Sequence, residues 1–451
     1  MVIHILLIVI TLLAGQASAA SPTAAVCVVQ HQNRVVMVKD SVSGRFGLTG
    51  GYVDGGETPQ QAALRELYEE TGLKGEILSP IGQWNRAMLF ACRTLTPLQV
   101  TPQGDVNLLH APNLGGEIRQ ARLINPAAPE VELRFPEQTH WLATRLPAGG
   151  DSQRQELRDF SQQGNLLHRA ELPWLERLQT ALTPLAPLLA VTNLFGEQAL
   201  YLVLLPLLLP WLGWPRLRAM LFTLGALAFC ITLSKLAIGW PRPFHLMPQL
   251  AEQASGGFGM PSGHTATALL FWGLLLRQWQ GCRQPLLWAM LAGVLTGLAR
   301  LELGVHFISD VLAGLLLGGL LLSQSETLAR LSARPLAWWT LSLLALALAW
   351  PTQSNALMAL ASLGSGLSLG QSLPLQRHAR PPLPTALLAL VGSLLCGLLQ
   401  WQLPYLMSSS LTILLLQWAS LLLLGLWLSA GIWLLSSTAI PGNDRYAREE
   451  A

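Results

Sequence analysis

Residues 200–213 read LYLVLLPLLLPWLG, residues 219–234 read AMLFTLGALAFCITLS, and residues 311–322 read VLAGLLLGGLLL, all without a charged residue. Runs that approach the length of a bilayer crossing favour membrane-spanning helices. Charged residues make up 12% of the 451-residue chain and hydrophobic residues 51%, which is far from an ordinary soluble enzyme. Residues 25–180 carry frequent charges instead. We therefore predict a soluble first part and an all-α membrane bundle over residues 197–436.

The charges between the apolar segments predict how the bundle is oriented. We expect nine spans, at 197–213, 219–238, 262–279, 286–302, 307–323, 335–350, 355–371, 384–402 and 409–436. Arginine pairs follow every odd-numbered span: Arg216 and Arg218, Arg277 and Arg283, Arg330 and Arg334, Arg377 and Arg380, and Arg445 and Arg448. The short loops 351–354 and 403–408 contain no Lys or Arg. By the positive-inside rule the arginine-rich side is cytoplasmic, so the chain before the first span lies outside.

The N-terminal segment agrees with this orientation. Residues 2–14 are apolar, and Gln16-Ala17-Ser18-Ala19 follows them as a small-residue pattern. This resembles a secretory signal peptide over residues 1–20, cleaved after Ala19. The segment has no Lys or Arg, so an uncleaved N-terminal anchor or a buried first strand is the alternative.

The five cysteines fit no metal-ligand spacing. Cys230, Cys282 and Cys396 lie in or beside apolar helices, where we expect packing residues. Cys27 and Cys92 fall in the soluble part, where we expect two free thiols rather than a disulfide.

The longest motif of the soluble part is residues 44–73, GRFGLTGGYVDGGETPQQAALRELYEETGL. Its Gly-rich residues 50–56 predict a loop. Thr58-Pro59 is a helix start signal, and Gly72 is a helix stop signal. The sequence therefore predicts a loop followed by a helix that ends at about Thr71.

Three carboxylates share one face of this predicted helix, because Glu66, Glu69 and Glu70 are spaced i, i+3 and i+4. Crowded carboxylates repel one another unless a hard cation lies among them. Oxygen ligands suit Mg²⁺ or Mn²⁺, either of which can bridge a diphosphate and activate water. A solvated acidic helix face is the alternative interpretation.

The motif resembles the Nudix box, which it matches without a gap from Gly51 to Leu73. The resemblance implies a Nudix hydrolase domain, an α/β sandwich, over residues 22–147. The β-branched runs 26–29 and 34–38 suit strands of such a sandwich. The implied roles are metal binding by Glu66, Glu69 and Glu70, orientation of these carboxylates by Arg65, and loop shaping by Gly51 and Glu57. Phe46 and Thr49 replace the Trp and Pro that the family often has there, which leaves the substrate open.

Residues 148–190 link the two parts. Leu175, Leu178 and Leu182 fall at helical spacing, with Glu176 and Arg177 between them. The pattern fits an interfacial helix that lies on the membrane, and it fits equally a linker helix packed on protein.

Three further segments gather basic and imidazole side chains near span ends. They are Lys235 with Arg242-Pro243, then Pro261-Ser262-Gly263-His264, then Arg300 with His306 and Asp310. In the predicted topology all three meet at the outer boundary of the membrane, on the side where basic residues are otherwise depleted. Ionisable residues at such positions favour a functional site, although anchoring at the interface is the usual role of a lone basic residue.

The chemistry of these residue types suits a phosphate. Lys235, Arg242 and Arg300 supply cations, and Arg offers bidentate geometry. Ser262 and Gly263 lie at a predicted helix start, where free N–H groups bind anions. His306 and Asp310 are one helical turn apart, so the carboxylate holds one imidazole nitrogen and leaves the other free.

The spacing resembles the type 2 phosphatidic acid phosphatase superfamily, and we assign it a domain over residues 191–325. The resemblance implies that His306 attacks phosphorus, Asp310 orients it, and His264 protonates the leaving oxygen, with no metal ion required. Ala299 stands where a Ser commonly precedes the Arg, which we expect to remove a supporting hydrogen bond. The last four spans, 335–436, carry no motif, so their role is not predicted.

Together these features predict a lipid phosphatase fused to a metal-dependent Nudix diphosphate hydrolase in a bacterial inner membrane, with both sites facing the periplasm. Undecaprenyl diphosphate is the expected substrate, and phosphatidylglycerophosphate or phosphatidic acid are the alternatives. The Nudix domain is expected to act on nucleoside diphosphate derivatives or on a lipid-linked diphosphate, and nothing indicates a nucleic-acid partner. A lipid transporter with inactive catalytic motifs is the alternative of a different class.

Overall fold

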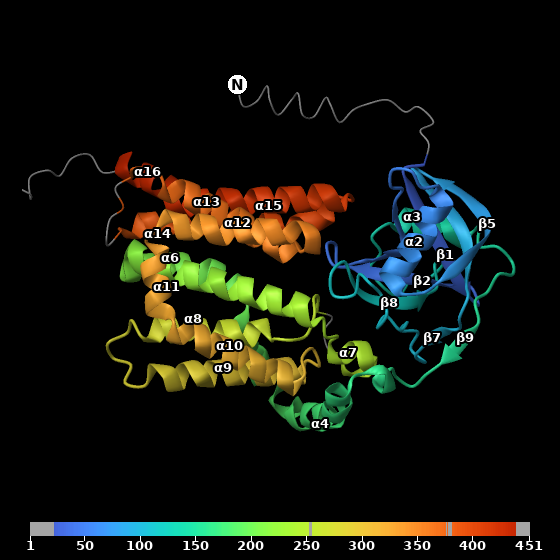
Figure 1. The fold of residues 1–451 in the computed structure, drawn as a ribbon, viewed down its shortest axis with the longest axis horizontal. Helices are drawn as coiled ribbons and strands as arrows, with labels where there is room; N and C mark the ends of the chain where they lie inside the picture. The colour runs from blue at the N-terminus through green and yellow to red at the C-terminus, as the bar shows by residue number, and fades with distance from the viewer. Residues whose placement is uncertain (1–21, 252–254, 376, 378–380, 439–451) are drawn as a thin grey trace, which may run out of the picture. The chain divides into compact units, whose positions relative to one another are not determined.

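The computed structural model describes residues 22–251, 255–375, 377 and 381–438, so the predicted signal peptide or anchor over 1–20 lies outside the described residues (Figure 1). The chain divides into two compact units. The first comprises residues 1–39, 45–113 and 120–157, and the second comprises residues 40–44, 114–119 and 158–451.

The first unit is built on a seven-stranded sheet with the order β3-β2-β1-β6-β5, in which β4 also pairs with β1 and β8 with β2. Its strands are β1 (Ala24–His31), β2 (Arg34–Asp40), β3 (Phe46–Leu48), β4 (Gly50–Tyr52), β5 (Gly75–Trp84), β6 (Ala87–Thr94) and β8 (Ile118–Ile124). A small second sheet pairs β7 (Leu98–Val100) with β9 (Arg154–Glu156). The two strands predicted from β-branched runs, 26–29 and 34–38, are confirmed as parts of β1 and β2.

Helix α2 (Pro59–Thr71) follows the Gly-rich loop as predicted. Thr58 and Gln61 cap its start reciprocally, through bonds between each side chain and the other residue's backbone N–H. Gly72 ends the helix in the left-handed conformation with φ 74°. Both ends of the helix therefore follow from residues that the sequence motif contains.

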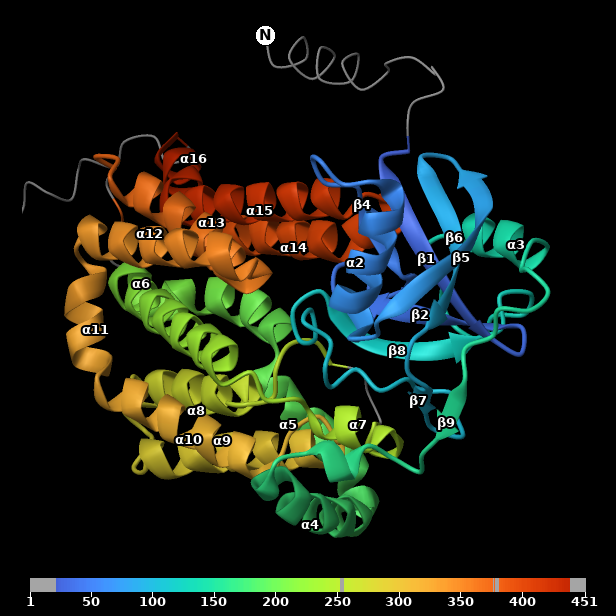
Figure 2. The same ribbon diagram turned by 45° about the vertical axis from the view of Figure 1, so that its right-hand side comes forward.

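Helices cover the central strand β1, whose six interior residues are all buried. Leu142 of α3 (Pro136–Ala143) packs with Val26 and Val28 in one apolar cluster, and α2 contacts β1 as well. Figure 2 shows α2 and α3 beside the strands from a second direction. The first unit is thus an α/β sandwich, as predicted.

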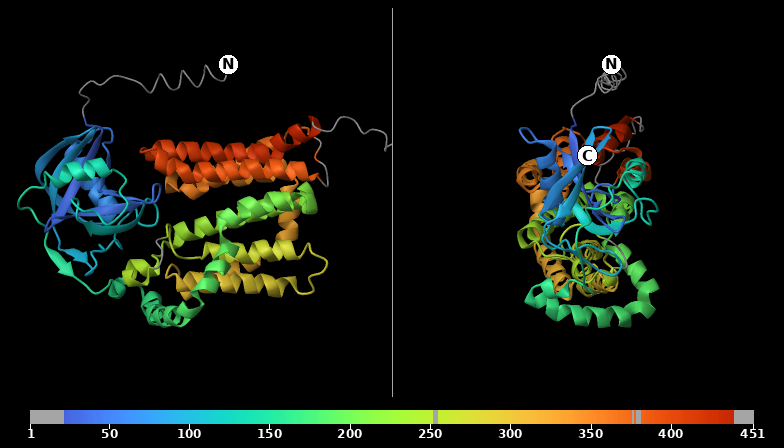
Figure 3. Two further views of the ribbon diagram at one scale, coloured as in Figure 1. Left: turned by 180° about the vertical axis from the view of Figure 1, so that it is seen from behind. Right: turned by 90° about the vertical axis from the view of Figure 1, so that its right-hand side faces the viewer.

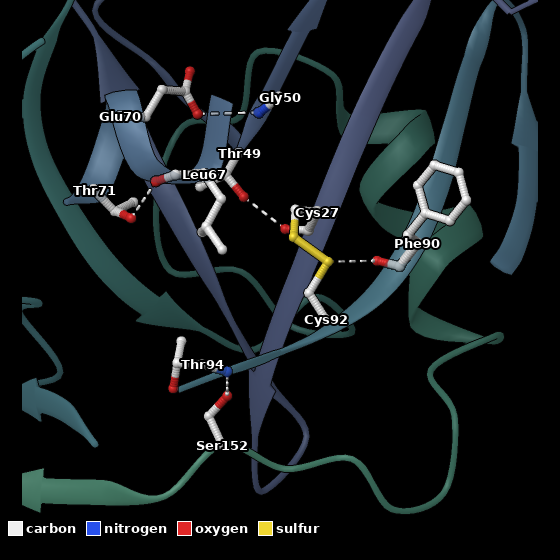
Figure 4. Close-up of a disulfide and its surroundings, with 10 residues drawn as sticks. All are labelled: Cys27, Thr49, Gly50, Leu67, Glu70, Thr71, Phe90, Cys92, Thr94 and Ser152. Carbon is white, nitrogen blue, oxygen red and sulfur yellow. Dashed lines mark hydrogen bonds between the residues drawn. A yellow bond between two sulfur atoms is a disulfide. The ribbon is translucent and has the colours of Figure 1, made fainter. Parts of the chain in front are cut away.

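A disulfide joins Cys27 of β1 to Cys92 of β6 (Figure 4). The two strands are parallel neighbours in which Cys27 lies opposite Phe90 and Val29 opposite Cys92. The cysteines therefore point to the same face of the sheet, with their Cα atoms 5.6 Å apart, within the usual range for a disulfide. The expectation of two free thiols was wrong, because the strand pairing that brings the two residues together is not visible in their spacing along the chain.

The second unit is all-helical over its described residues, as predicted. Its longer helices are α4 (Leu166–Leu182), α5 (Ala186–Asn193), α6 (Gln198–Ile238), α8 (Gly263–Leu276), α9 (Pro285–Glu302), α10 (Ile308–Ser323), α11 (Ser325–Ser332), α12 (Pro335–Thr352), α13 (Asn355–Gln371), α14 (Leu383–Leu406), α15 (Ser410–Leu426) and α16 (Ile432–Thr438). Helices α8, α9 and α10 pack together, α12 to α15 form a second group, and α6 contacts both groups (Figure 1).

Six helical segments of the described chain are long and apolar enough to cross a membrane, or seven if the bent pair α10 and α11 counts as one span. We expected nine spans. The six segments include Leu166–Gly196, which was not among the nine, and the first two expected spans lie in one continuous segment, Gln198–Leu246. Helices α8 and α13, with only 14 and 17 residues, are not counted, and α10 counts only together with α11. Within α6, Gly213 has non-helical angles (φ 72°, ψ 162°), so two helices meet at the predicted boundary.

The linker forms helix α4, as predicted. Leu172 and Leu175 are buried, and Gln179 donates hydrogen bonds to the backbone oxygens of Leu250 and Glu302. The exposed side carries Trp174 together with the charged Glu176 and Arg177. Figure 3 shows α4 running roughly crosswise to the bundle helices. One face of α4 is therefore packed on protein, and the other exposes both apolar and charged side chains.

Candidate active sites

His306 and Asp310 form a buried pair at the start of α10. Imidazole Nδ1 lies 3.1 Å from Oδ2 of Asp310, and the same oxygen accepts a hydrogen bond from the Phe307 N–H at 2.9 Å. The other ring nitrogen, Nε2, lies 3.2 Å from Nη1 of Arg242. A guanidinium only donates hydrogen bonds, so Nε2 is the acceptor and Nδ1 carries the proton. The lone pair of Nε2 therefore faces a cationic group.

Backbone oxygens of the loop before α8 fix the cations. Arg242 donates to Gly256 and Gly257 at 2.7 and 2.8 Å, and Lys235 donates to Phe258 at 2.7 Å. These hydrogen bonds restrict the conformations of the two long side chains. The loop thus holds the two cationic groups near His306 through its backbone oxygens.

The segment that contains Ser262 and His264 meets this pair at the start of α8. Ser262 is the N-cap residue of the helix, and its N–H donates to the backbone oxygen of Asp310 at 2.9 Å. Gly314 allows this approach, because a Cβ there would lie 2.5 Å from the Ser262 oxygen. The predicted helix start at Gly263 is confirmed, and the first-turn N–H groups of α8 are available to an anion.

His264 has an acidic partner that the sequence analysis did not identify. Its Nε2 lies 3.1 Å from Oε1 of Glu197, and Asn193 donates to the same oxygen at 3.2 Å. The Asn193 amide oxygen accepts in turn from Arg300 at 3.2 Å. Glu197 is the single acidic residue between Glu176 and Glu252, which was the signal available in the sequence.

All the charged and imidazole residues of the three segments meet in one region. Lys235, Arg242, His264 and Arg300 are each close enough to His306 to act on it electrostatically. The structure therefore brings together the three segments that the sequence analysis singled out.

A second acidic residue that was not identified supports α10 from outside the site. Glu171 of α4 accepts hydrogen bonds from the backbone N–H and the hydroxyl of Ser309, at 3.2 and 3.3 Å. Helix α4 thereby holds the start of the helix that carries Asp310.

The carboxylates of the first unit surround Arg65. Its guanidinium donates to Glu66 at 2.8 Å, to Glu69 at 2.9 Å and to Glu57 at 2.9 Å. The bond from Arg65 lowers the pKa of the Glu57 carboxyl, and the carboxylates, Glu57 first, raise the pKa of Arg65. Glu70 accepts from the Gly50 N–H at 3.0 Å.

Gly51 lies against this cluster. A Cβ at Gly51 would be 2.3 Å from Oε1 of Glu66. No larger residue fits beside that carboxylate without displacing it. The close approach gives a physical reason for glycine at this place in the motif.

A divalent cation fits the chemistry of this donor set, because Glu66, Glu69 and Glu70 offer only hard oxygen ligands on one helix face. In this structure Arg65 forms ion pairs with Glu66 and Glu69. Among the described residues, no group of three or more His, Cys, Asp or Glu side chains is arranged so that it could hold a metal ion. Metal binding therefore requires Arg65 to release Glu66 and Glu69. When bound, the cation would neutralise a diphosphate and activate water.

Family models match both units. The NUDIX domain model matches residues 20–144, and the PAP2 superfamily model matches residues 216–325. The chain thus carries a NUDIX domain and a PAP2 superfamily domain, as the two motifs predicted.

Curated relatives match smaller parts of the chain. Sphingosine-1-phosphate phosphatase 2 of Mus musculus is 31% identical over 136 residues, which cover 28% of this chain and 38% of the relative. ADP-ribose pyrophosphatase of Methanocaldococcus jannaschii is 34% identical over 61 residues, which cover 13% and 36%. Nudix hydrolase 25 of Arabidopsis thaliana is 38% identical over 65 residues, which cover 14% and 37%. The chain thus spans well under half the length of these relatives.

Solved structures give weaker likenesses. UDP-X diphosphatase is 16% identical, with 32% of this chain and 73% of that chain covered and a TM-score of 0.22. An ADP-ribose pyrophosphatase from Streptococcus suis is 13% identical, with 29% and 97% covered and the same TM-score.

Proposed function

We propose that this protein is a membrane lipid phosphatase that forms a phospho-histidine intermediate on His306, fused to a metal-dependent Nudix diphosphate hydrolase. The observation that carries the proposal is the buried His306–Asp310 pair, in which Nδ1 faces the carboxylate and the unprotonated Nε2 lies 3.2 Å from Nη1 of Arg242. A nucleophile needs a lone pair directed at a bound electrophile, and a cation at that position is where a phosphate oxygen binds.

The first half of the reaction transfers the phosphoryl group. Nε2 of His306 forms a bond to the terminal phosphorus while the bond from that phosphorus to the leaving oxygen breaks; this oxygen belongs to the lipid alcohol in a monophosphate and to the lipid phosphate in a diphosphate. His264 gives its proton to that oxygen, and Glu197 stabilises the doubly protonated imidazole beforehand. Lys235, Arg242 and Arg300 balance the charge of the phosphoryl oxygens.

The second half releases phosphate. Water attacks phosphorus, His264 accepts a proton from that water, and the phosphorus–nitrogen bond breaks. His306 and the protonated form of His264 are both regenerated. The steps proposed for this site use residues of the chain itself.

We place both sites on the periplasmic face of a bacterial inner membrane. The arginine pattern and the signal-like N-terminus predict that the soluble domain is exported. The Cys27–Cys92 disulfide supports this independently, because disulfides persist in oxidising compartments. Six or seven candidate spans fit a multi-pass protein.

Undecaprenyl diphosphate is the substrate we favour, because a lipid phosphatase with an outward-facing site suits a carrier lipid that is released outside. The relative named sphingosine-1-phosphate phosphatase favours a second candidate, a lipid monophosphate such as phosphatidylglycerophosphate or phosphatidic acid. Relatives named ADP-ribose pyrophosphatase and 8-oxo-dGTP diphosphatase support a nucleoside diphosphate derivative for the Nudix site, with a lipid-linked diphosphate as the other substrate class.

The decisive experiment is an assay of phosphate release by the purified full chain from undecaprenyl diphosphate, phosphatidylglycerophosphate and phosphatidic acid, with and without Mg²⁺. We expect release in the presence of a chelator from at least one of the three. Absence of release from all three contradicts the proposal.

A further inference from the structure

An apolar cavity of about 630 Å³ lies between α8 and α9. Its lining is dominated by Trp272 and Leu276 of α8, Leu291 and Leu295 of α9, and Phe195. Leu291 is 42% exposed, so the cavity opens on the side of the bundle as a groove. None of these residues belongs to the three catalytic segments.

The groove begins beside the candidate catalytic acid. Phe195 packs edge-on against Trp272, with ring centroids 5.4 Å apart. The next residue, Gly196, lies directly against His264, because a Cβ on Gly196 would be 2.8 Å from the His264 Cβ. Glu197 then bonds to the imidazole. Three consecutive residues thus connect the groove to His264.

The stereochemistry of phosphoryl transfer assigns a direction to the substrate. The attacking and leaving atoms lie roughly in line on opposite sides of phosphorus. If His306 attacks and His264 protonates the leaving oxygen, that oxygen lies on the His264 side. The leaving oxygen carries the lipid, so the hydrocarbon chain must depart from the side where the groove begins.

We infer that the groove between α8 and α9 binds the hydrocarbon tail of the lipid phosphate. The inference rests on the proposed function and adds a specificity site to it. Apolar side chains dominate the lining, which suits a hydrocarbon chain. On the α8 side the lining runs from Trp272 to Trp279, which follows the end of the helix. On α9 it runs from Trp288 to Leu295, about 10 Å along the helix axis, so the groove can hold part of a long hydrocarbon chain.

A substitution that fills the groove with a larger side chain tests the inference. Leu291→Trp places an indole in the groove at a partly exposed position of α9. Leu316→Trp on α10 is the matched control, because Leu316 is 76% exposed and does not line the groove. We expect Leu291→Trp to lower the ratio of kcat/KM for hexadecyl phosphate to kcat/KM for butyl phosphate about tenfold. Leu316→Trp should leave the ratio as in the wild type. An unchanged ratio in Leu291→Trp overturns the inference while the phosphatase stands.

Labelling of the unaltered protein is a second measurement that needs no variant. A hexadecyl phosphate with a photoreactive group at the end of its chain should label residues of α8 or α9 that line the groove. Labelling confined to other helices overturns the inference. If the wild type releases phosphate from neither alkyl phosphate nor any natural lipid, the proposed function itself fails.

Discussion

The two candidate sites of this chain handle the same chemical group with opposite charge. The first unit collects carboxylates around one arginine. The second collects cations that donate to backbone oxygens and imidazoles that pair with carboxylates. A site made of carboxylates repels a diphosphate until a cation joins it. A site made of cations attracts phosphate as it stands. The two domains should therefore differ in metal dependence, in nucleophile and in their response to single substitutions.

The largest expected effect separates the two sites by nucleophile. His306→Ala removes the only group that we propose to bond phosphorus, so phosphatase turnover should fall on the order of 10⁴-fold. Release of phosphate from the lipid substrate measures it. Hydrolysis by the Nudix site of the nucleoside diphosphate derivative that the wild type cleaves is the internal control and should be unchanged in the same variant. A variant that retains lipid phosphatase activity refutes the phospho-histidine mechanism.

The next largest expected effect distinguishes the two sites by their dependence on a metal ion. Glu69→Gln should lower diphosphate hydrolysis by the Nudix site about 100-fold, because a ligand of the cation is lost. Glu76→Gln, an exposed carboxylate paired with Arg93, is the control. Chelation should abolish the same activity and leave lipid phosphate release intact. Equal activity of Glu69→Gln and wild type would mean that the acidic face is only a partner for Arg65.

A smaller effect sharpens the assignment within the second site. Glu197→Gln keeps the shape of the side chain but removes its charge, so His264 should protonate the leaving oxygen less well. We expect kcat for an alkyl phosphate to fall about tenfold. An aryl phosphate with an acidic leaving group needs little protonation and should be hydrolysed at the wild-type rate. If both substrates slow equally, Glu197 supports only the fold.

The difference between the sites also explains what the sequence could predict. The acidic site is local: Glu66, Glu69 and Glu70 lie on one helix, so their spacing alone gives a shared face, and the caps of α2 are in the same motif. The basic site is assembled from distant segments. Only a resemblance and a topology argument could predict that residues of α6, α8 and α10 meet.

Contacts between residues that belong to no recognisable motif could not be predicted from the sequence. Glu197 reaches across 67 positions to His264, and Glu171 reaches across 138 positions to Ser309. Such pairs depend on which helices pack together, and helical periodicity does not specify neighbours. The expected count of nine spans failed for a related reason. Hydropathy alone could not show that helix α8 has only 14 residues.

The smallest effect on turnover comes from the disulfide, and it tests where the first unit resides. Replacing Cys27 and Cys92 by Ala removes a cross-link between residues 65 positions apart, which should lower the free energy of unfolding of the Nudix domain by about 4 kcal/mol through the entropy of the unfolded chain. Nudix activity before heating should stay near the wild-type value, because neither cysteine bonds to the acidic cluster. The measurement is the temperature at which each activity is lost. We expect the Nudix site to lose activity at a lower temperature in the double variant and the phosphatase to lose it at the wild-type temperature. The control variant Cys282→Ala, which removes a free thiol, should change neither temperature.

The oxidation state of the two cysteines tests the periplasmic assignment directly. Their Cα atoms lie 5.6 Å apart, so an oxidising compartment should join them in a disulfide. Free thiols at Cys27 and Cys92 in unreduced protein isolated from membranes would contradict the periplasmic assignment.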